Sequence, residues 1–147
     1  MFKFSLDPVL ALREKIEDNK KRELGEATMY QDIVYQEKVM LEVLQEETLN
    51  LTRQQGVNQV DISSIKLLNQ YNNYMIQVIE DKDKELERAK EQVESKRQEL
   101  LEAVKDRKIL ENLRSIYKEN YDEEEKRAEQ RILDDIVTYR FGNKGKR

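Results

Sequence analysis

The sequence of 147 residues contains no cysteine, no histidine and no tryptophan. Without cysteine the chain forms no disulfide and offers no thiolate to a metal, and without histidine it lacks the commonest general base and metal ligand. There is no glycine-rich phosphate loop, and the acidic run that begins at Asp122 lacks the alternating ligand spacing of a calcium loop. We therefore expect a protein that is not an enzyme and that uses no cofactor and no metal.

Long apolar runs and an excess of one charge are also missing. No stretch approaches the eighteen or so apolar residues that a membrane span needs, and Asp7 and Pro8 interrupt the apolar N-terminus before it can act as a secretion signal. The 27 basic and 31 acidic residues are mixed along the chain, which disfavours nucleic acid and membrane surfaces as direct partners. We expect a soluble, cytoplasmic protein.

What the sequence does contain is a sustained helical repeat in its second half. Between Ser63 and Phe141, apolar residues return at alternating three- and four-residue steps with no proline and no glycine inside the repeat. This is the a/d pattern of a coiled-coil helix, and a stripe so narrow requires a second helix against it. The stripe consists of Ile65, Leu68, Met75, Ile79, Leu86, Ala89, Val93, Leu100, Ala103, Leu110, Tyr117, Tyr121 and Ala128.

A first helix is predicted to begin at Asp7, as its N-cap, and Pro8. Gly25 in its interior costs about 1 kcal/mol against alanine and indicates either a close approach of the partner helix, a bend or a tolerated flaw. The predicted stripe is Leu6, Val9, Ile16, Ala27, Tyr30, Val34, Leu41, Leu44 and Leu51, with Leu24 beside it and with polar breaks at Arg13, Lys20, Glu23, Glu37 and Thr48.

The two helices are predicted to fold back on each other. Gly56 suits the end of the first helix and Asp61 or Ser63 the cap of the second, and a connection this short makes neighbouring helices antiparallel. The expected fold is all-α, a long antiparallel two-helix coiled-coil hairpin with unequal arms in a single domain. Its expected parts are a helix over about 8–54, a turn over about 55–61, a helix over about 62–141 and a basic tail over 142–147.

Unequal arms leave part of the second helix uncovered. Folding back near position 58 pairs Leu41 with Met75 and Leu24 with Val93, so that Ile109 to Phe141 have no intramolecular partner. An uncovered stripe of this length indicates a binding surface, and the alternative is that two hairpins associate through it. The expected stripe is Leu110, Leu113, Tyr117, Tyr121, Ala128, Ile132, Ile136 and Tyr139.

A second surplus of apolar residues lies just after the turn. Tyr71, Tyr74 and Val78 fall on a face beside the seam that carries Leu68 and Met75. Aromatic and aliphatic residues on a coiled-coil flank are plausible contact anchors. The alternative is that this end of the hairpin is packed more thickly.

Three segments are informative in combination: the opening Phe2-Lys-Phe-Ser-Leu-Asp-Pro-Val-Leu-Ala-Leu-Arg-Glu, the stretch Tyr71-Asn-Asn-Tyr-Met, and the closing Glu124-Glu-Lys-Arg-Ala-Glu-Gln-Arg-Ile-Leu-Asp-Asp-Ile-Val-Thr-Tyr-Arg-Phe. In this order, and over nearly the whole chain, they resemble the FliJ family of the bacterial flagellar type III export apparatus. Where family members often have small residues after the acidic pair Asp134 and Asp135, this chain has Ile136 and Val137.

The resemblance implies a function and two sets of contact residues. FliJ proteins are similar to the central stalk (gamma subunit) of rotary ATP synthases, are held to sit in the ring of the export ATPase (FliI) and promote its assembly, bind the export gate protein (FlhA), and help to recycle export chaperones. A structural, homo-oligomeric coiled-coil adaptor unrelated to flagella is the alternative. Carried over, the gate contact corresponds to Tyr71, Tyr74, Met75 and Val78, and the ring contact to Tyr117, Tyr121, Ala128, Arg131, Ile132, Asp135, Ile136 and Tyr139.

Overall fold

The computed structural model describes residues 1–57 and 61–144, and these are almost entirely helical. Helix α1 spans Asp7–Val57 and helix α2 spans Ile62–Lys144, with 51 and 83 residues. The described residues contain no β-strand. The helices contribute to two compact units, which we call the hairpin unit (Asp18–Leu101) and the terminal unit (Met1–Glu17 with Glu102–Arg147). The expected all-α class with two arms of unequal length is confirmed.

The two helices begin at different kinds of residue. In α1 the first helical hydrogen bond runs from the Leu10 amide to the Leu6 carbonyl oxygen (2.9 Å), so Leu6 holds the N-cap position and Asp7 is already inside the helix. The Asp7 carboxylate instead receives the Nε of Arg114 (3.2 Å). In α2 the Asp61 carbonyl oxygen accepts from the amides of Ser64 (3.0 Å) and Ile65 (3.4 Å), which makes Asp61 the cap.

Both helices continue beyond the glycines that were expected to end them. Gly56 lies inside α1 and Gly142 inside α2, because glycine is a frequent helix stop but does not by itself forbid helical dihedral angles. The predicted stops were therefore early by a few residues, which is the usual uncertainty of helix ends. The rest of the predicted turn and tail, residues 58–60 and 145–147, lies outside the described part of the chain.

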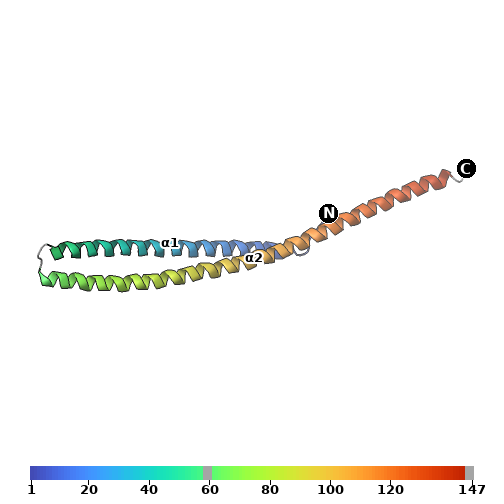
Figure 1. Cartoon of the computed structure of the whole chain (residues 1–147). Coiled ribbons are helices and arrows are strands. Elements are labelled where there is room, and N and C mark those ends of the chain that lie inside the picture. The colour runs from blue at the N-terminus through green and yellow to red at the C-terminus, as the bar shows by residue number, and fades with distance from the viewer. Residues whose placement is uncertain (58–60, 145–147) are drawn as a thin grey trace. The chain divides into compact units, whose positions relative to one another are not determined.

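In the hairpin unit α1 and α2 run side by side in opposite directions (Figure 1). The direction follows from ion pairs: Lys20 contacts Glu99 (3.1 Å), whereas Lys38, further along α1, contacts Asp83 (2.6 Å). The predicted pairing is close to these contacts: it would have placed Lys20 near position 97 and Tyr30 near position 87, and these residues contact Glu99 and Glu85. The buried side chains of this unit include Val34, Met75, Leu86, Ala89 and Val93, so the predicted stripe of α2 forms the seam here.

The predicted stripe of α1 was wrong at four of its nine positions, whereas Leu6, Ile16 and Leu41 are half-buried as expected. Val34 and Ala27 do face α2, but Val9, Tyr30, Leu44 and Leu51 are 38–52% exposed. The positions one residue later line the seam instead, and most of them are polar. They are Leu10 and Glu17 in the terminal unit and Leu24, Gln31, Lys38, Gln45 and Thr52 in the hairpin unit, all buried or half-buried.

A polar seam is stable here because its charges find partners on the opposite helix. Lys38 contacts Asp83 in the hairpin unit, and in the terminal unit the buried carboxylate of Glu17 receives the guanidinium of Arg107, which also donates to Glu111 (2.7 Å). A buried charge is tolerated when it is paired and hydrogen-bonded. Prediction from hydrophobicity alone therefore assigned Val9, Tyr30, Leu44 and Leu51 to the seam of α1, in place of the more polar positions that follow each of them.

The terminal unit covers more of α2 than expected. Asp7 at the start of α1 already contacts Arg114 of α2, and the non-helical residues before it continue along α2 as far as Tyr121. Phe4 is buried against Tyr117, and Phe2 packs on Tyr121. The prediction that Ile109 onward has no partner is thus wrong up to Tyr121. From Asp122 to Asn143 every side chain of α2 is exposed.

Candidate partner-binding surfaces

The hairpin unit carries an apolar surface on both helices next to the turn. We call it the hairpin-end surface and define it by its exposed side chains. From α1 these are Met40 (68% exposed), Leu44 (45%) and Leu51 (52%), and from α2 they are Leu67 (67%), Tyr71 (42%), Tyr74 (64%) and the half-buried Val78.

One hydrogen bond shows that the two halves of this surface lie on the same flank of the seam. The Tyr30 hydroxyl of α1 donates to Glu85 Oε1 of α2 (2.8 Å). Leu44 and Leu51 follow Tyr30 by two and three heptads, and Val78 and Tyr71 precede Glu85 by one and two. Residues whole heptads apart share one side of a coiled-coil helix. The two helices therefore present these apolar side chains on the same flank.

A cluster of paired charged side chains borders this surface on the side away from the turn. Lys82 pairs with Glu37 and with Glu85 (3.1 Å). Hydrogen bonds from Tyr30 and then Lys82 lower the pKa of Glu85, and the hydrogen bond to Glu37 leads the causes that raise the pKa of Lys82. The bond to Glu85 also raises the pKa of the Tyr30 hydroxyl. Tyr30, Glu37 and Lys82 thus belong to the bridge between the helices, and the apolar area begins beyond them.

Below the hairpin-end surface the seam contains a polar residue that the sequence pattern did not single out. Asn72 is 7% exposed and its Nδ2 donates weakly to Thr52 Oγ1 (3.4 Å). Its Oδ1 is buried and has no hydrogen-bond partner within the part of the chain that the structure describes. Only its seven-residue distance from Ile65 and Ile79 in the repeat could have indicated that it is buried.

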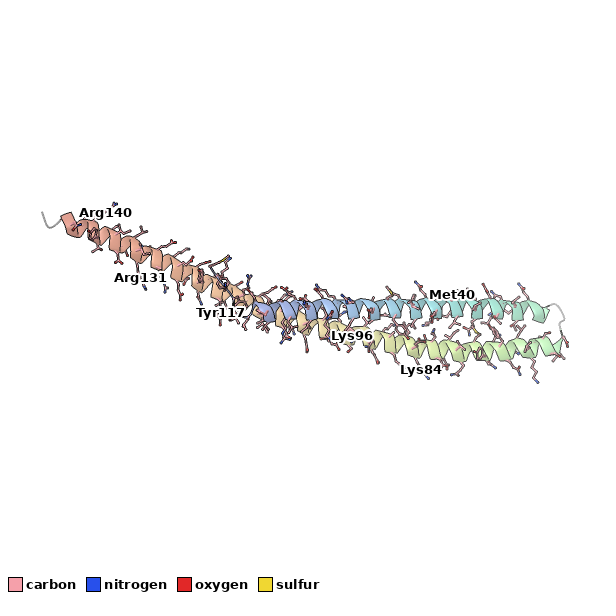
Figure 2. All side chains as sticks on the ribbon, turned by 180° about the vertical axis from the view of Figure 1, so that it is seen from behind. Met40, Lys84, Lys96, Tyr117, Arg131 and Arg140 are labelled. Atoms are coloured by element: carbon pink, nitrogen blue, oxygen red, sulfur yellow. The ribbon has the colours of Figure 1, made fainter. Side chains whose placement is uncertain are left out.

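The terminal unit carries the second surface, on residues 122–144 of α2, which we call the overhang. Figure 2 labels Arg131 and Arg140 on this part of α2, where no second helix of the described residues runs alongside. Ile132 is 59% exposed, Ile136 47% and Tyr139 71%. A shallow hollow near the end is lined by Val137, Tyr139, Arg140, Phe141 and Asn143.

The start of the overhang is bordered by the residues that precede α1. We call residues 1–6 the strap. The ring of Phe2 lies 5.6 Å from that of Tyr121, and the ring of Phe4 lies 5.7 Å from that of Tyr117 in an edge-to-face arrangement. A hydrogen bond to Glu125 is the main cause that raises the pKa of the Tyr121 hydroxyl.

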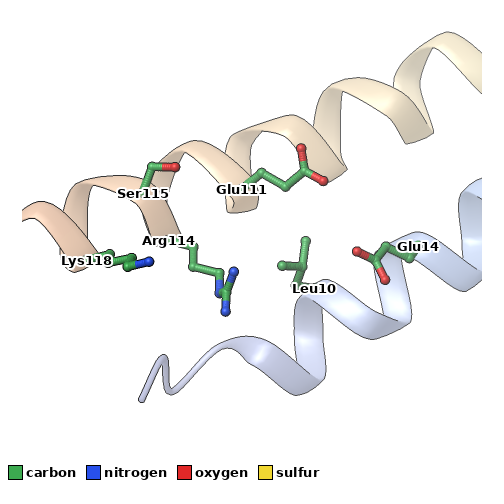
Figure 3. Close-up of a pocket in the computed structure, with 6 residues that line it drawn as sticks. All are labelled: Leu10, Glu14, Glu111, Arg114, Ser115 and Lys118. Carbon is green, nitrogen blue, oxygen red and sulfur yellow. The ribbon is translucent and has the colours of Figure 1, made fainter. Parts of the chain in front are cut away.

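An open groove of about 330 Å³ lies between the start of α1 and residues 111–118 of α2 (Figure 3). Leu10 lies among side chains of both charges, Glu14 and Glu111 with Arg114 and Lys118, and Ser115 completes the lining. Arg114 and Glu111 already contact Asp7 and Arg107. Because its charges are balanced and partly paired, the groove favours neither an anion nor a cation. Across residues 1–57 and 61–144 there is also no group of acidic side chains that could hold a metal ion.

The comparison with known protein families gives a match over nearly the whole chain. The sequence model of the family described as "Flagellar FliJ protein" matches residues 2–146. The chain belongs to the FliJ family. Membership makes it a component of the flagellar protein export apparatus. The FliJ family is a non-catalytic family of that apparatus. Neither the curated proteins nor the solved structures contain a match. No helix within the described ranges is long and apolar enough to cross a membrane.

The residues expected at the FliJ gate contact do not all lie at the surface. Tyr71, Tyr74 and Val78 belong to the hairpin-end surface, but Met75 is 3% exposed and lies in the seam against α1. Met75 therefore supports its neighbours instead of offering a contact of its own. Sequence reasoning missed Met40, Leu44 and Leu51 on this surface, because it left Met40 out and assigned the two leucines to the seam of α1.

The residues expected at the ring contact fall into two groups. Tyr117 and Tyr121 lie under the strap, where Tyr117 keeps 46% of its surface exposed and Tyr121 is half-buried. The others lie exposed on the overhang: Ala128, Arg131, Ile132, Asp135, Ile136 and Tyr139.

Proposed function

We propose that this FliJ-family protein connects the flagellar export ATPase to the export gate and promotes assembly of the ATPase ring, without catalysing a reaction itself. The proposed site of action is cytoplasmic, at the inner face of the membrane, reached through its partners. The observation that carries the proposal is the presence of two large exposed apolar surfaces in different units of the chain. Exposed apolar areas of this kind usually mark interaction sites.

The hairpin-end surface is the proposed contact for the gate protein FlhA. It offers two tyrosines, Tyr71 and Tyr74, beside Leu44 and Leu51. Aromatic side chains surrounded by aliphatic ones are typical of the residues that dominate binding energy. Met75 and Asn72 beneath them are buried, which fixes the positions of the tyrosines before a partner arrives.

The overhang is the proposed contact for the ATPase FliI. Ile132, Ile136 and Tyr139 project from a single helix, and an apolar stripe on a lone helix fits the helix-in-groove mode of recognition. Arg131 and Asp135 flank the stripe and are the proposed polar contacts. The wider set of proposed partners includes the ATPase regulator and the export chaperones, which the same assembly would bring close to the gate.

Two alanine variants test the assignment of surfaces to partners. Tyr71→Ala with Tyr74→Ala is expected to weaken gate binding by about 10- to 100-fold, as for loss of binding hot spots, and to leave ATPase binding unchanged. Ile132→Ala with Ile136→Ala is expected to do the reverse. All four residues are substantially exposed, so circular dichroism should report an unchanged helix content for both variants.

Matched controls distinguish a specific binding surface from nonspecific hydrophobic binding. Leu101→Ala in the hairpin unit and Ile109→Ala with Ile116→Ala in the terminal unit remove exposed apolar side chains of α2 outside both surfaces. Each control should bind both partners normally. If a control weakens binding as much as its matched variant, or if the tyrosine variant loses the ATPase instead of the gate, the assignment is wrong.

Self-association is the competing function, because two copies could cover each other's exposed apolar residues. Light scattering of the isolated protein distinguishes the two. An interaction protein should keep the mass of one chain, 17.6 kDa, across a wide concentration range. A homo-oligomeric adaptor would show a mass that rises with concentration, and the alanine variants above would then lower it.

A further inference from the structure

We propose that the strap is a removable cover: residues 1–6 occupy the Tyr117 and Tyr121 part of the ring-binding stripe in the free protein, and an apolar helical segment of the docking ATPase replaces them. This inference rests on the proposed contact between the overhang and the ATPase. It adds that the contact extends beneath the strap and that the protein's own chain competes for it.

The residues beneath the strap and the exposed residues of the overhang form one stripe on α2. Ala128, Ile132 and Tyr139 follow Tyr121 by 7, 11 and 18 residues. At about 100° per residue in a straight helix, these three lie within about 20° of the direction of Tyr121. A helix that packs along the overhang from Tyr139 toward Tyr121 therefore meets the strap on the same side of α2.

The strap fills this side with aromatic side chains. Phe4 is 4% exposed although it lies outside any helix, and its ring contacts Tyr117 edge to face at 5.7 Å. Phe2 contacts Tyr121 at 5.6 Å. A partner helix can reach the exposed part of Tyr117, but it must displace Phe2 and Phe4 to contact the ring surfaces of Tyr117 and Tyr121 that they cover.

The strap is held without regular secondary structure, since residues 1–4 form neither helix nor strand. Besides its two ring contacts, the Met1 amino group donates to the Tyr121 hydroxyl (2.7 Å), and the Asp7 amide donates to the Phe4 carbonyl oxygen (3.1 Å). The aromatic contacts must offset the entropy lost when the whole segment is ordered. A partner that brings comparable apolar groups on a preformed helix loses less entropy, so replacement is favoured.

Fluorine NMR tests the proposal with the native sequence, because the chain contains three phenylalanines. Protein labelled with 4-fluorophenylalanine should give one signal each for Phe2, Phe4 and Phe141, assigned with single Phe→Leu variants. Unlabelled ATPase hexamer is then added. Phe141 lies on the overhang and is 71% exposed, so its signal reports docking, whereas Phe2 and Phe4 report the strap.

We expect the Phe141 signal to broaden on docking and the Phe2 and Phe4 signals to stay narrow and move to their shifts in the urea-unfolded protein. If Phe141 broadens and the other two broaden at their original shifts, the strap stays in place and this inference is overturned while the ring contact stands. If all three signals are unchanged at saturating ATPase, the ring contact itself is wrong and the strap inference falls with it.

Removal of the strap gives a second measurement. A cover that occupies the site for most of the time reduces apparent affinity by the fraction of uncovered protein. Phe2→Ser with Phe4→Ser should therefore lower the apparent Kd for the ATPase by about three- to tenfold. Leu12→Ser, which removes an exposed leucine of the same unit, should leave it unchanged. Weaker binding of the double variant would show that the phenylalanines are part of the contact and would overturn the proposal.

Discussion

Gly25 weakens α1 and does not allow a close approach of another helix. It lies in the helix interior, is exposed, and an added Cβ would meet no atom within 4 Å. The close approach of a partner helix that its presence suggested is therefore absent at this position. The glycine is best described as a tolerated flaw, since it costs backbone entropy and provides no room that another side chain uses.

Gly25→Ala should raise the free energy of unfolding by about 0.5–1 kcal/mol, because alanine restricts the unfolded chain and favours the helix. The measurement is the melting temperature by circular dichroism at 222 nm. Gly142→Ala is the matched control, since it also has open space around its Cβ but lies in the last turn of α2, where helix ends fray. A lower melting temperature for Gly25→Ala would contradict the finding that a Cβ added at this position meets open space.

Asn72 is the seam residue whose hydrogen-bonding capacity is least satisfied. Its Oδ1 is buried without a partner among the described residues, while its neighbour Thr52 already donates to the Thr48 carbonyl oxygen (2.8 Å). Replacing Asn72 by an apolar side chain of similar shape therefore leaves no new orphan group. A buried asparagine in a coiled coil commonly fixes register at a cost in stability.

Asn72→Leu should accordingly raise the free energy of unfolding by about 1 kcal/mol, the desolvation cost of one buried polar atom. Urea unfolding followed by circular dichroism measures this change. Thr52→Val in the same background should add little. A lower urea midpoint for Asn72→Leu would contradict this expectation, because it would show that Asn72 makes a stabilising hydrogen bond.

At the scale of the helices, charges hold the seam where hydrophobicity is weak. In the hairpin unit Lys20 and Lys96 alternate with Glu23 and Glu99 at 3.1–3.4 Å. The hydrogen bond from Lys96 is the first cause that lowers the pKa of Glu23, and that from Lys20 the first that lowers the pKa of Glu99. The same bonds raise the pKa of both lysines.

These shifts predict the pH dependence of stability. Carboxylates with a lowered pKa stabilise the fold above their usual value of 4.5 and lose that contribution as the pH falls through the lower folded value; lysines with a raised pKa stabilise it below 10.5 and lose it as the pH rises further. With no histidine in the chain, the melting temperature should stay constant from about pH 5.5 to 9. A decrease between pH 5.5 and 7 would show that other groups control stability.

The sequence predicted α2 well and α1 poorly, for a physical reason. In α2 the small and aliphatic residues Ala89, Val93 and Ala103 occupy the seam, so hydrophobic periodicity and packing agree. In α1 the exposed Tyr30 and Leu44 are more apolar than the half-buried Lys38 and Gln45. Periodicity cannot show that a lysine has an aspartate opposite it, because that depends on the pairing of two helices.

The same reasoning applies to the candidate surfaces. Tyr71, Tyr74 and the overhang could be found from sequence because they exceed what one seam can bury. Met40, Leu44 and Leu51 could not, because their exposure follows from the register of α1. The contact of the strap with Tyr117 and Tyr121 was missed because a short aromatic segment ahead of a helix has no periodicity.

In the whole molecule, two separate surfaces are proposed to let one chain bind two proteins. The hairpin unit and the terminal unit each carry one exposed apolar surface, and α1 and α2 both run through the two units. A helical connection can hold two bound partners in one assembly without a catalytic step. The proposal therefore requires a ternary complex in which neither partner excludes the other.

The most direct test is the light-scattering mass of a mixture of this protein, the export ATPase and the cytosolic part of the gate protein. The account predicts a peak whose mass is the sum of all three components. It also predicts that Tyr71→Ala with Tyr74→Ala removes only the gate protein from that peak, and that Ile132→Ala with Ile136→Ala removes only the ATPase. Mutually exclusive binary complexes, or loss of both partners with either variant, would contradict it.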